Sequence, residues 1–144
     1  MPENTVVLAA DHAGWELKNA LKVWIEARGL AAIDLGAHDG GSVDYPDMAA
    51  ALAAVLAEGR AKRGVLVCGT GIGISIAANR HAHVRAALCH DVTTARLTRQ
   101  HNDANVLALG ARVIGVQTAL DCLAAFLDTP FEGGRHQRRV DKMS

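Results

Sequence analysis

The sequence is poor in aromatic residues and has no excess of charge of either sign. Aromatics make up 3% of the 144 residues, while half of the chain is apolar, so small and aliphatic side chains supply most of the apolar content. That composition excludes a disordered chain and favours closely packed layers of helices and strands. Fifteen basic and fifteen acidic residues cancel, so no overall positive field attracts nucleic acid. Any anion must be bound by a local cluster.

Long hydrophobic runs and a disulfide framework are also missing. A membrane-spanning helix needs about 20 consecutive apolar residues, and the apolar runs here are broken after a few positions. The N-terminal residues lack the basic start and long apolar segment of a secretory signal, so we expect a cytoplasmic protein with no membrane partner. The three cysteines, Cys68, Cys89 and Cys122, are an odd number, and we expect reduced thiols.

The length predicts a single domain that spans residues 1–144, since a chain of this size builds one core and not two. Short apolar runs, which alternate with helical segments, lie at residues 5–10, 31–35, 64–68, 85–89 and 105–109. Helical patterns follow these runs. One begins at Trp15 and ends at Gly29, one begins after Asp91 as its N-cap, and three lie at 48–56, 74–80 and 116–127. Continuous apolar runs are typical of strands buried on both faces. We therefore predict an α/β fold, with a five-stranded parallel sheet between two helix layers and right-handed crossovers.

Two segments do not fit the alternating pattern. Residues 36–47 are rich in turn formers and predict a loop of functional length, in which Tyr45 is the only large side chain. The tail at residues 130–144 is polar and basic and shows no apolar face of its own around residues 132–139. We therefore expect this tail to pack on something other than its own core.

Reactive side chains gather at the ends of the predicted elements. In an open parallel sheet, ligands bind outside the carboxyl ends of the strands. Asp11 and His12 follow the first strand, Cys68 ends the third, and His101 and Asn102 end the helix before the fifth. The sequence therefore predicts that an acid, a base, a thiol and an amide converge there. The plainer alternative is that Asp11 caps a helix and that His101 and Asn102 only end one.

A glycine-rich turn, Gly69 to Gly73, follows Cys68 directly. Its spacing fits neither the Walker loop nor the dinucleotide fingerprint, which disfavours a nucleotide cofactor. Glycines at a helix N-terminus expose backbone N–H groups that can hold an oxyanion. The same positive end stabilises a thiolate, so Cys68 is a candidate base. The alternative is a small buried residue that ends a strand, the role we expect for Cys89 and Cys122.

Charged residues of the tail form a second candidate group. Arg135 and Arg139 are four residues apart and share a face if the tail is helical, and His136 adds to them. Such a cluster suits a phosphate, although a solvated tail is the plainer alternative. The other histidines, His38, His81, His83 and His90, lack the spacing of a metal site, so we predict no metal and treat them as surface or structural residues.

The order of these motifs resembles a known family. The motifs are Asp11-His12, Asp44-Tyr45-Pro46, the run from Cys68 to Asn79, Thr98 to Asp103, Asn105-Val106-Leu107 and Gly133 to His136. Together they resemble the sugar-phosphate isomerases, a family that includes ribose-5-phosphate isomerase B and the galactose- and allose-6-phosphate isomerases. The resemblance covers nearly the whole chain and implies a Rossmann-like three-layer sandwich.

The resemblance implies interconversion of an aldose and a ketose phosphate through a cis-enediolate, with no metal and no cofactor. Cys68 would be the base, Thr70 its hydrogen-bonded neighbour, His101 the acid that opens the sugar ring, and Asp11 the partner of the anomeric hydroxyl. The residues that would bind the substrate or its phosphate are His12, Tyr45, Gly69, Gly71, Ile72, Gly73, Asn102, Arg112, Arg135 and Arg139. One branch of the family uses a Glu at the position of Ile74, so this chain resembles the cysteine-base branch.

Family members are dimers or tetramers with shared active sites, which implies that the basic tail reaches a neighbouring subunit. Ribose 5-phosphate and ribulose 5-phosphate are the expected substrates, and allose 6-phosphate, galactose 6-phosphate or a tetrose phosphate are the alternatives. Two other functions remain open at this point. One is a phosphosugar-binding module without catalysis, and the other is an enzyme in which Cys68 is a covalent nucleophile with His101 as its base.

Overall fold

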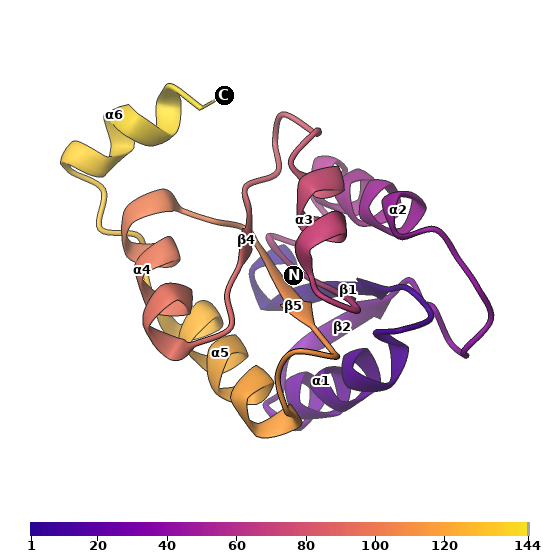
Figure 1. The fold of residues 1–144 in the computed structure, drawn as a ribbon. Helices are drawn as coiled ribbons and strands as arrows, with labels where there is room; N and C mark the ends of the chain where they lie inside the picture. The colour runs from indigo at the N-terminus through magenta and orange to yellow at the C-terminus, as the bar shows by residue number, and fades with distance from the viewer. Residues whose placement is uncertain (144) are drawn as a thin grey trace.

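The structure, a computed structural model that describes residues 1–143, contains one parallel five-stranded sheet between helices (Figure 1). The strands are β1 (Thr5–Ala10), β2 (Ala31–Asp34), β3 (Arg63–Cys68), β4 (Ala86–Leu88) and β5 (Val106–Gly110). Their order in the sheet is β2-β1-β3-β5-β4. The helices are α1 (Trp15–Ala27), α2 (Tyr45–Ala57), α3 (Ile72–Ala78), α4 (Val92–Asn102), α5 (Val116–Asp128) and α6 (Arg135–Asp141), after a 3-10 turn at Pro2–Asn4.

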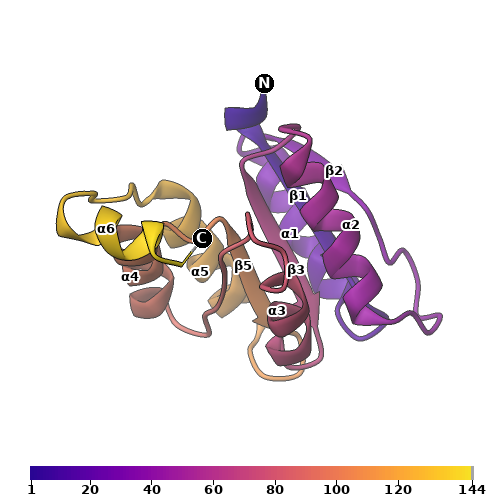
Figure 2. The same cartoon turned by 90° about the horizontal axis from the view of Figure 1, so that it is seen from above.

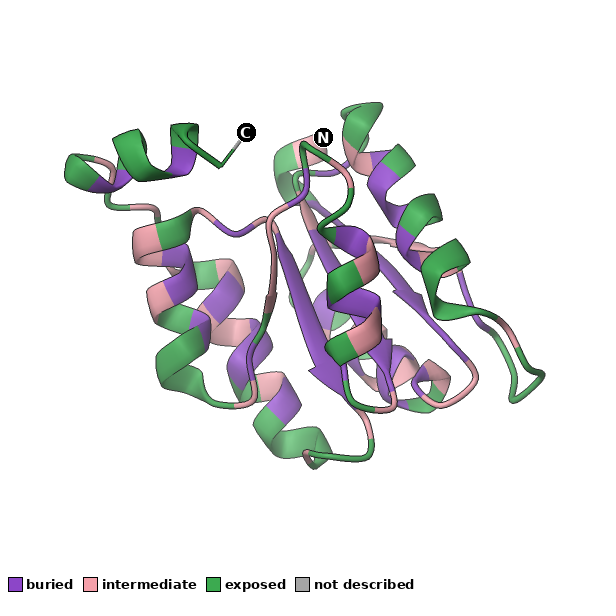
Figure 3. Ribbon diagram, turned by 45° about the horizontal axis from the view of Figure 1, so that its top comes forward, coloured by how far each residue is buried: buried purple, intermediate pink, exposed green. Residues whose placement is uncertain are grey.

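The helices cover both faces of the sheet and give the predicted three layers (Figure 2). One core cluster joins the sheet to α1, α4 and α5, with Leu21 and Phe126 among its fully buried members. The other joins it to α2 and α3, with Leu52 and Ile74 fully buried. Figure 3 shows buried residues along the strands and on one side of the helices that cover them. The predicted α/β class is therefore confirmed.

The two edge strands differ from the prediction. Every residue of β1 is buried and so is every residue of β5, as expected for strands covered on both faces. In contrast, β2 and β4 consist of half-buried and exposed residues, and β4 is shorter than the predicted strand at 85–89. The expectation that all five runs are buried on both faces was wrong for these two. An edge strand has one neighbouring strand and is only partly covered by the helices, so its side chains are more exposed to solvent.

Two helices begin earlier than predicted. Helix α2 starts at Tyr45 with Asp44 as its N-cap, which shortens the predicted loop to residues 36–44. Pro46 lies in the first turn, where a missing N–H costs nothing and the fixed φ suits a helix. Helix α3 starts at Ile72, directly after the left-handed Gly71. The prediction for α4 was correct, because Asp91 caps it and its side chain accepts the N–H of Thr94 at 2.6 Å.

The tail forms the short helix α6 and lies against the end of α4 (Figures 1 and 2). His136 and Val140 are buried there, with 8% and 5% of their surface exposed. The expected absence of an apolar face is therefore wrong in part, since α6 packs on its own chain through these two side chains. None of the helices within residues 1–143 is long and apolar enough to cross a membrane.

Candidate active site

The turns that follow β1 and β3 lie side by side at the carboxyl edge of the sheet. These strands are neighbours, and β1 also pairs with β2 on its other side, so the strand order reverses at this point. The N–H of Asp11 donates to the carbonyl oxygen of Val67 at 3.2 Å, which joins the two turns directly. A Cβ built on Gly14 would lie 2.4 Å from the same carbonyl oxygen, so only glycine permits this approach. The predicted proximity of Asp11 and Cys68 is confirmed.

The Cys68 thiol lies inside the glycine-rich turn. Its Sγ accepts the backbone N–H of Gly71 at 3.1 Å, and the residue is 4% exposed. Gly71 has φ of 77°, and a Cβ on it would lie 3.0 Å from the carbonyl oxygen of Leu109, so both conformation and space require glycine. An N–H directed at sulfur stabilises a thiolate more than a thiol. The local geometry therefore suits Cys68 as a base.

The backbone amides of the turn are not all free for a ligand. The Ile72 N–H donates to the Thr70 hydroxyl at 3.2 Å, and the Gly71 N–H is used by Cys68. The Thr70 hydroxyl thus bonds to the backbone N–H of Ile72 and not to the thiol. Gly73 lies in the first turn of α3, where N–H groups have no acceptor within the helix. We therefore expect Gly73 to be the amide of α3 that faces an oxyanion.

Asp11 and His12 are fixed by backbone donors. The Asp11 Oδ1 accepts the N–H groups of Ala13 and Gly14 at 2.9 and 3.1 Å, and the residue is 6% exposed. The plainer alternative, that Asp11 caps α1, is wrong, because Gly14 is the N-cap and α1 has no side-chain cap; Asp11 instead holds the turn before the helix. The Val43 N–H donates to Nδ1 of His12 at 3.3 Å. A ring that accepts at Nδ1 carries its proton at Nε2, and it can donate that proton to a phosphate oxygen.

Tyr45 and Arg112 border the same turn from two sides. A Cβ on Gly73 would lie 2.6 Å from Cζ of Tyr45 and 2.9 Å from its hydroxyl oxygen, so the ring covers the start of α3. The Arg112 guanidinium lies near Gly69, since a Cβ there would be 3.5 Å from Nη1. Arg112 is exposed, and its backbone N–H donates to the carbonyl oxygen of Gly69 at 2.9 Å. A shallow pocket lies beside them, lined by Asp11, His12, Ser42, Val43, Asp44, Tyr45, Pro46 and Asp47.

His101 and Asn102 do not join this group within one chain. They end α4, which runs back from the carboxyl edge of the sheet to the start of β5. Cys68 pairs with Gly110 at the other end of β5, and five strand residues span about 13 Å. The predicted convergence of His101 and Asn102 with Cys68 at the carboxyl edge therefore does not occur within a single chain. The physical reason is that a helix connecting parallel strands ends at the amino edge, so its last residues face away from the carboxyl edge.

The C-terminal basic residues lie on the same side of the chain as His101. Arg135 and Arg139 are exposed on α6, which packs against α4. His136 is buried between the helices, and its ring stacks on that of His101 with centroids 4.5 Å apart. The expected clamp of Arg135, Arg139 and His136 is therefore wrong for His136, because it lies on the other face of the helix. Sequence reasoning missed the contact between the two histidines, which only the docking of α6 creates.

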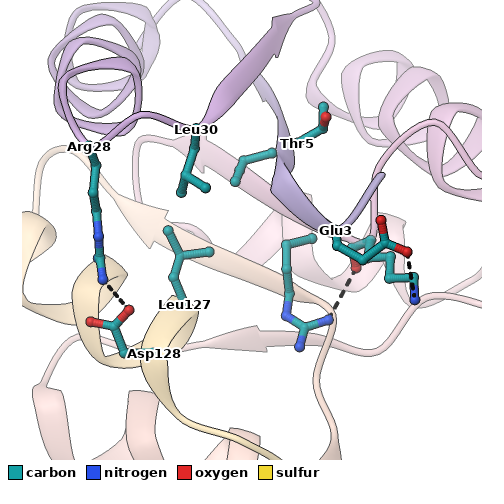
Figure 4. A pocket seen from close by; sticks show the side chains of 9 residues that line it. Glu3, Thr5, Arg28, Leu30, Leu127 and Asp128 are labelled. Carbon is teal, nitrogen blue, oxygen red and sulfur yellow. Dashed lines mark hydrogen bonds and ion pairs between the residues drawn. The ribbon is translucent and has the colours of Figure 1, made fainter. Parts of the chain in front are cut away.

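A further depression lies away from these residues, at the amino edge of the sheet. Figure 4 shows its walls, which include Glu3, Thr5, Arg28, Leu30, Leu127 and Asp128. Arg28 pairs with Asp128, Lys62 lies 3.6 Å from Glu3, and Arg63 adds one further positive charge. Its lining contains no cysteine and no histidine, so it holds none of the predicted catalytic side chains. We therefore place the candidate chemistry at the carboxyl edge.

The remaining cysteines and two of the histidines have structural roles. Burial raises the pKa of Cys122 to about 11 and also raises that of Cys89, so both stay thiols near neutral pH. His90 accepts the N–H of Gly110 at 3.1 Å, and His83 lies 2.7 Å from the carbonyl oxygen of Ala53. The structural interpretation of these four residues is confirmed.

Comparison with known proteins places the chain in a family. Residues 6–143 match the family described as Ribose/Galactose Isomerase. Ribose-5-phosphate isomerase B of Escherichia coli is 43% identical over 139 residues, which cover 96% of this chain and 93% of that protein. D-erythrulose-4-phosphate isomerase of Pectobacterium atrosepticum is 41% identical over 140 residues, 96% of this chain and 92% of that one.

Solved structures give the same assignment. A ribose-5-phosphate isomerase B of Clostridium thermocellum superposes with a TM-score of 0.95 at 45% identity, over 96% of this chain and 94% of that chain. The sequence resemblance is thereby confirmed over nearly the full length, and the matched proteins catalyse isomerisations by name. The chain belongs to the ribose/galactose isomerase family and is an intramolecular oxidoreductase that isomerises sugar phosphates.

Proposed function

We propose that the protein interconverts D-ribose 5-phosphate and D-ribulose 5-phosphate, with Cys68 as the base that moves the proton. The observation that carries the proposal is the Cys68 Sγ, which accepts the Gly71 N–H at 3.1 Å beside the turn that holds Asp11. This is a thiol held where a thiolate is stabilised, next to an acid and to the first turn of α3. A binding module without catalysis needs no thiol at this point.

The reaction follows from these groups. The Cys68 thiolate takes the C2 proton of the open-chain aldose, and the electrons of that bond form the C1–C2 double bond of an enediolate. The backbone amide of Gly73 donates to the developing oxyanion, the kind of preorganised interaction that contributes most to many enzymes. The thiol then returns its proton to C1 while the proton of the C2 hydroxyl passes to the C1 oxygen, which leaves a hydroxyl on C1 and the carbonyl at C2. Asp11 holds or deprotonates the anomeric hydroxyl, and His12 and Arg112 bind the phosphate.

Ring opening requires an acid that the chain does not bring to Cys68. His101 lies at the opposite edge of the sheet, about 13 Å away along β5. We propose that a second copy supplies His101, Asn102, Arg135 and Arg139 to the site that contains Cys68. The copies would form a dimer or part of a tetramer.

An apolar surface beside the thiol turn supports this arrangement. Ile72 and Ile76 are 51% and 55% exposed on one face of α3, and Leu88 of β4 and Val92 of α4 are 37% and 42% exposed. Leu88 is near Gly71, since a Cβ on that glycine would lie 2.6 Å from its Cδ1. A second copy that covers these side chains would remove apolar surface from water. It would also bring its own α4 and α6 close to Cys68.

The substrate is tested by comparing kcat/KM for phosphorylated sugars of different length. The purified protein is assayed with ribose 5-phosphate, erythrose 4-phosphate, allose 6-phosphate and galactose 6-phosphate, before and after treatment with a chelator. We expect the highest kcat/KM with ribose 5-phosphate and no loss on chelation. A higher value for the tetrose phosphate would move the chain to the activity for which its Pectobacterium relative is named. Activity on none of them would refute the proposed isomerase.

A further inference from the structure

The ring of His101 is not free to turn, because a second histidine covers its face. The rings of His101 and His136 have centroids 4.5 Å apart and planes 14° apart. His136 is 8% exposed, whereas His101 is half-buried. One ring of the stack is therefore open to a ligand, and the other is enclosed between α4 and α6.

Both segments that carry the stack are held firmly. The Glu132 N–H donates to the carbonyl of Gln100 at 3.1 Å, which ties the start of the tail to the residue before His101. Arg99 is 2% exposed and joins the end of α4 to the loop after α5, through the carbonyl of Thr129 at 3.3 Å. Its Nη1 also donates to Asp103 at 2.8 Å. The stack is thus part of a rigid junction.

An exposed carboxylate lies beside His136. The Nε2 of His136 lies 3.5 Å from Oε1 of Glu132. One ligand atom from each of His101, Glu132 and His136 lies within 4.8 Å of the others, a composition that would also suit a metal. The lone pairs of an imidazole lie in the plane of its ring, however, and two nearly parallel rings do not direct theirs at one point. The stacked geometry therefore favours a role in holding and protonating His101 over metal binding.

The charges around the stack decide which ring carries a proton. Two protonated rings 4.5 Å apart would repel each other, so the stack holds one proton more readily than two. Burial lowers the pKa of His136, and His101, Arg135 and Arg139 lower it further, against the opposite effect of Glu132. His101 lies in the last turn of α4, where the helix carbonyls favour a positive charge. His136 is therefore the ring of the stack that its surroundings keep neutral.

We propose that His136 is a positioning residue that fixes the ring plane of His101 and, by staying neutral itself, leaves the proton needed for ring opening to His101. The inference rests on the proposed function, since it assigns the shared proton to the acid of that reaction. His136 itself does not touch the substrate. It acts by stacking and by remaining neutral.

The first test is an NMR titration without substrate. Histidine labelled with ¹³C at Cε1 is incorporated into the wild type, His136→Phe, Glu132→Gln and, as an exposed control on the same helix, Arg138→Gln. We expect the His101 signal of the wild type to titrate in two steps, because protonation of its neighbour is sensed through the stack. His136→Phe keeps a ring in the stack and should leave one step, Glu132→Gln should move the second step to lower pH, and the control should match the wild type. A His101 curve with one step in the wild type, unchanged by His136→Phe, would overturn the proposal.

The second test separates ring opening from proton transfer. Ribulose 5-phosphate cannot form a furanose, because its C5 oxygen carries the phosphate, so exchange of its C1 hydrogen with D₂O needs no ring opening. For His136→Ala we expect kcat with ribose 5-phosphate to fall about tenfold with KM nearly unchanged, while the exchange rate stays within about twofold. His136→Phe should recover most of the lost kcat, since it restores the stack.

Two kinetic outcomes would contradict the role of His136. A rise in KM alone would mean that His136 only anchors α6 with its arginines, and an equal fall of turnover and exchange would mean that it supports the whole site. Absence of all turnover in the wild type would refute the proposed function instead. In that case the NMR titration, which needs no substrate, still decides whether His136 controls the protonation of His101.

Discussion

Two variants that are each defective at one site residue should restore activity when they are mixed. Cys68→Ala removes the thiol at the carboxyl edge of β3, and His101→Asn removes the imidazole at the opposite edge, about 13 Å away along β5. If each site takes Cys68 from one copy and His101 from the other, a mixed dimer has one intact site and one doubly defective site. Random mixing of equal amounts makes half of the dimers mixed, so about a quarter of wild-type turnover should return.

The assay measures turnover of ribose 5-phosphate after subunit exchange, which is verified by co-purification of an untagged variant with a tagged one. The matched control mixes Cys68→Ala with Asp11→Asn, because both residues lie at the same edge and belong to the same half of the site. Mixed dimers in the control contain no intact site and should show no gain over the parents. Failure of the first mixture to recover after proven exchange, or equal recovery in the control, would refute the division of the site between copies.

Three further predictions follow from charges in the structure. Arg139→Ala should raise KM for ribose 5-phosphate about 10- to 100-fold with kcat nearly unchanged, which corresponds to about 1.5–3 kcal/mol for a charge-assisted contact, and steady-state kinetics checks it. Lys18 is fully buried and bonded to Asp34 at 2.6 Å, so Lys18→Met should lower the free energy of unfolding in urea by about 3 kcal/mol. Burial holds the pKa of His136 below its ordinary value of 6.5. As pH falls, His136 therefore takes up a proton in the undocked tail before it does so in the docked one. The docking of α6 should weaken from pH 6.5 downward. Hydrogen exchange at the amide of Val140 measures this, and protection that is constant from pH 7 to 5 would contradict it.

The central part of the fold could be predicted because its strands are continuous apolar runs. The strand predicted at residues 5–10 is β1, and β3 begins one residue earlier than predicted, at Arg63. The edge strands were less predictable, because apolar content alone does not say which strands lie at the edge. The start of α2 was missed because Pro46 was taken as part of a loop, although proline is equally suited to a first helical turn.

The candidate site, like the fold, could be predicted only in part from the sequence. The proximity of Asp11 and Cys68 could be predicted, because residues that follow parallel strands share one edge of the sheet. The placement of His101 was wrong because the direction of the helix was not considered, and a connecting helix returns to the amino edge before the next strand. The partner of His101 could not have been found from sequence, since His136 reaches it only through the docking of a short tail helix with two buried side chains.

The central claim is that Cys68 moves a proton between two carbons of a sugar phosphate, and isotope exchange tests it most directly. Ribose 5-phosphate is incubated with the wild type, Cys68→Ala and Cys89→Ala in D₂O, and the ribulose 5-phosphate formed is examined by ¹H NMR. We expect deuterium at C1 of the product from the wild type and from Cys89→Ala, whose thiol is buried in the core. We expect a loss of about 10²–10⁴-fold for Cys68→Ala, the usual contribution of a general base. Undiminished deuterium incorporation by Cys68→Ala, or none by the wild type, would contradict the account.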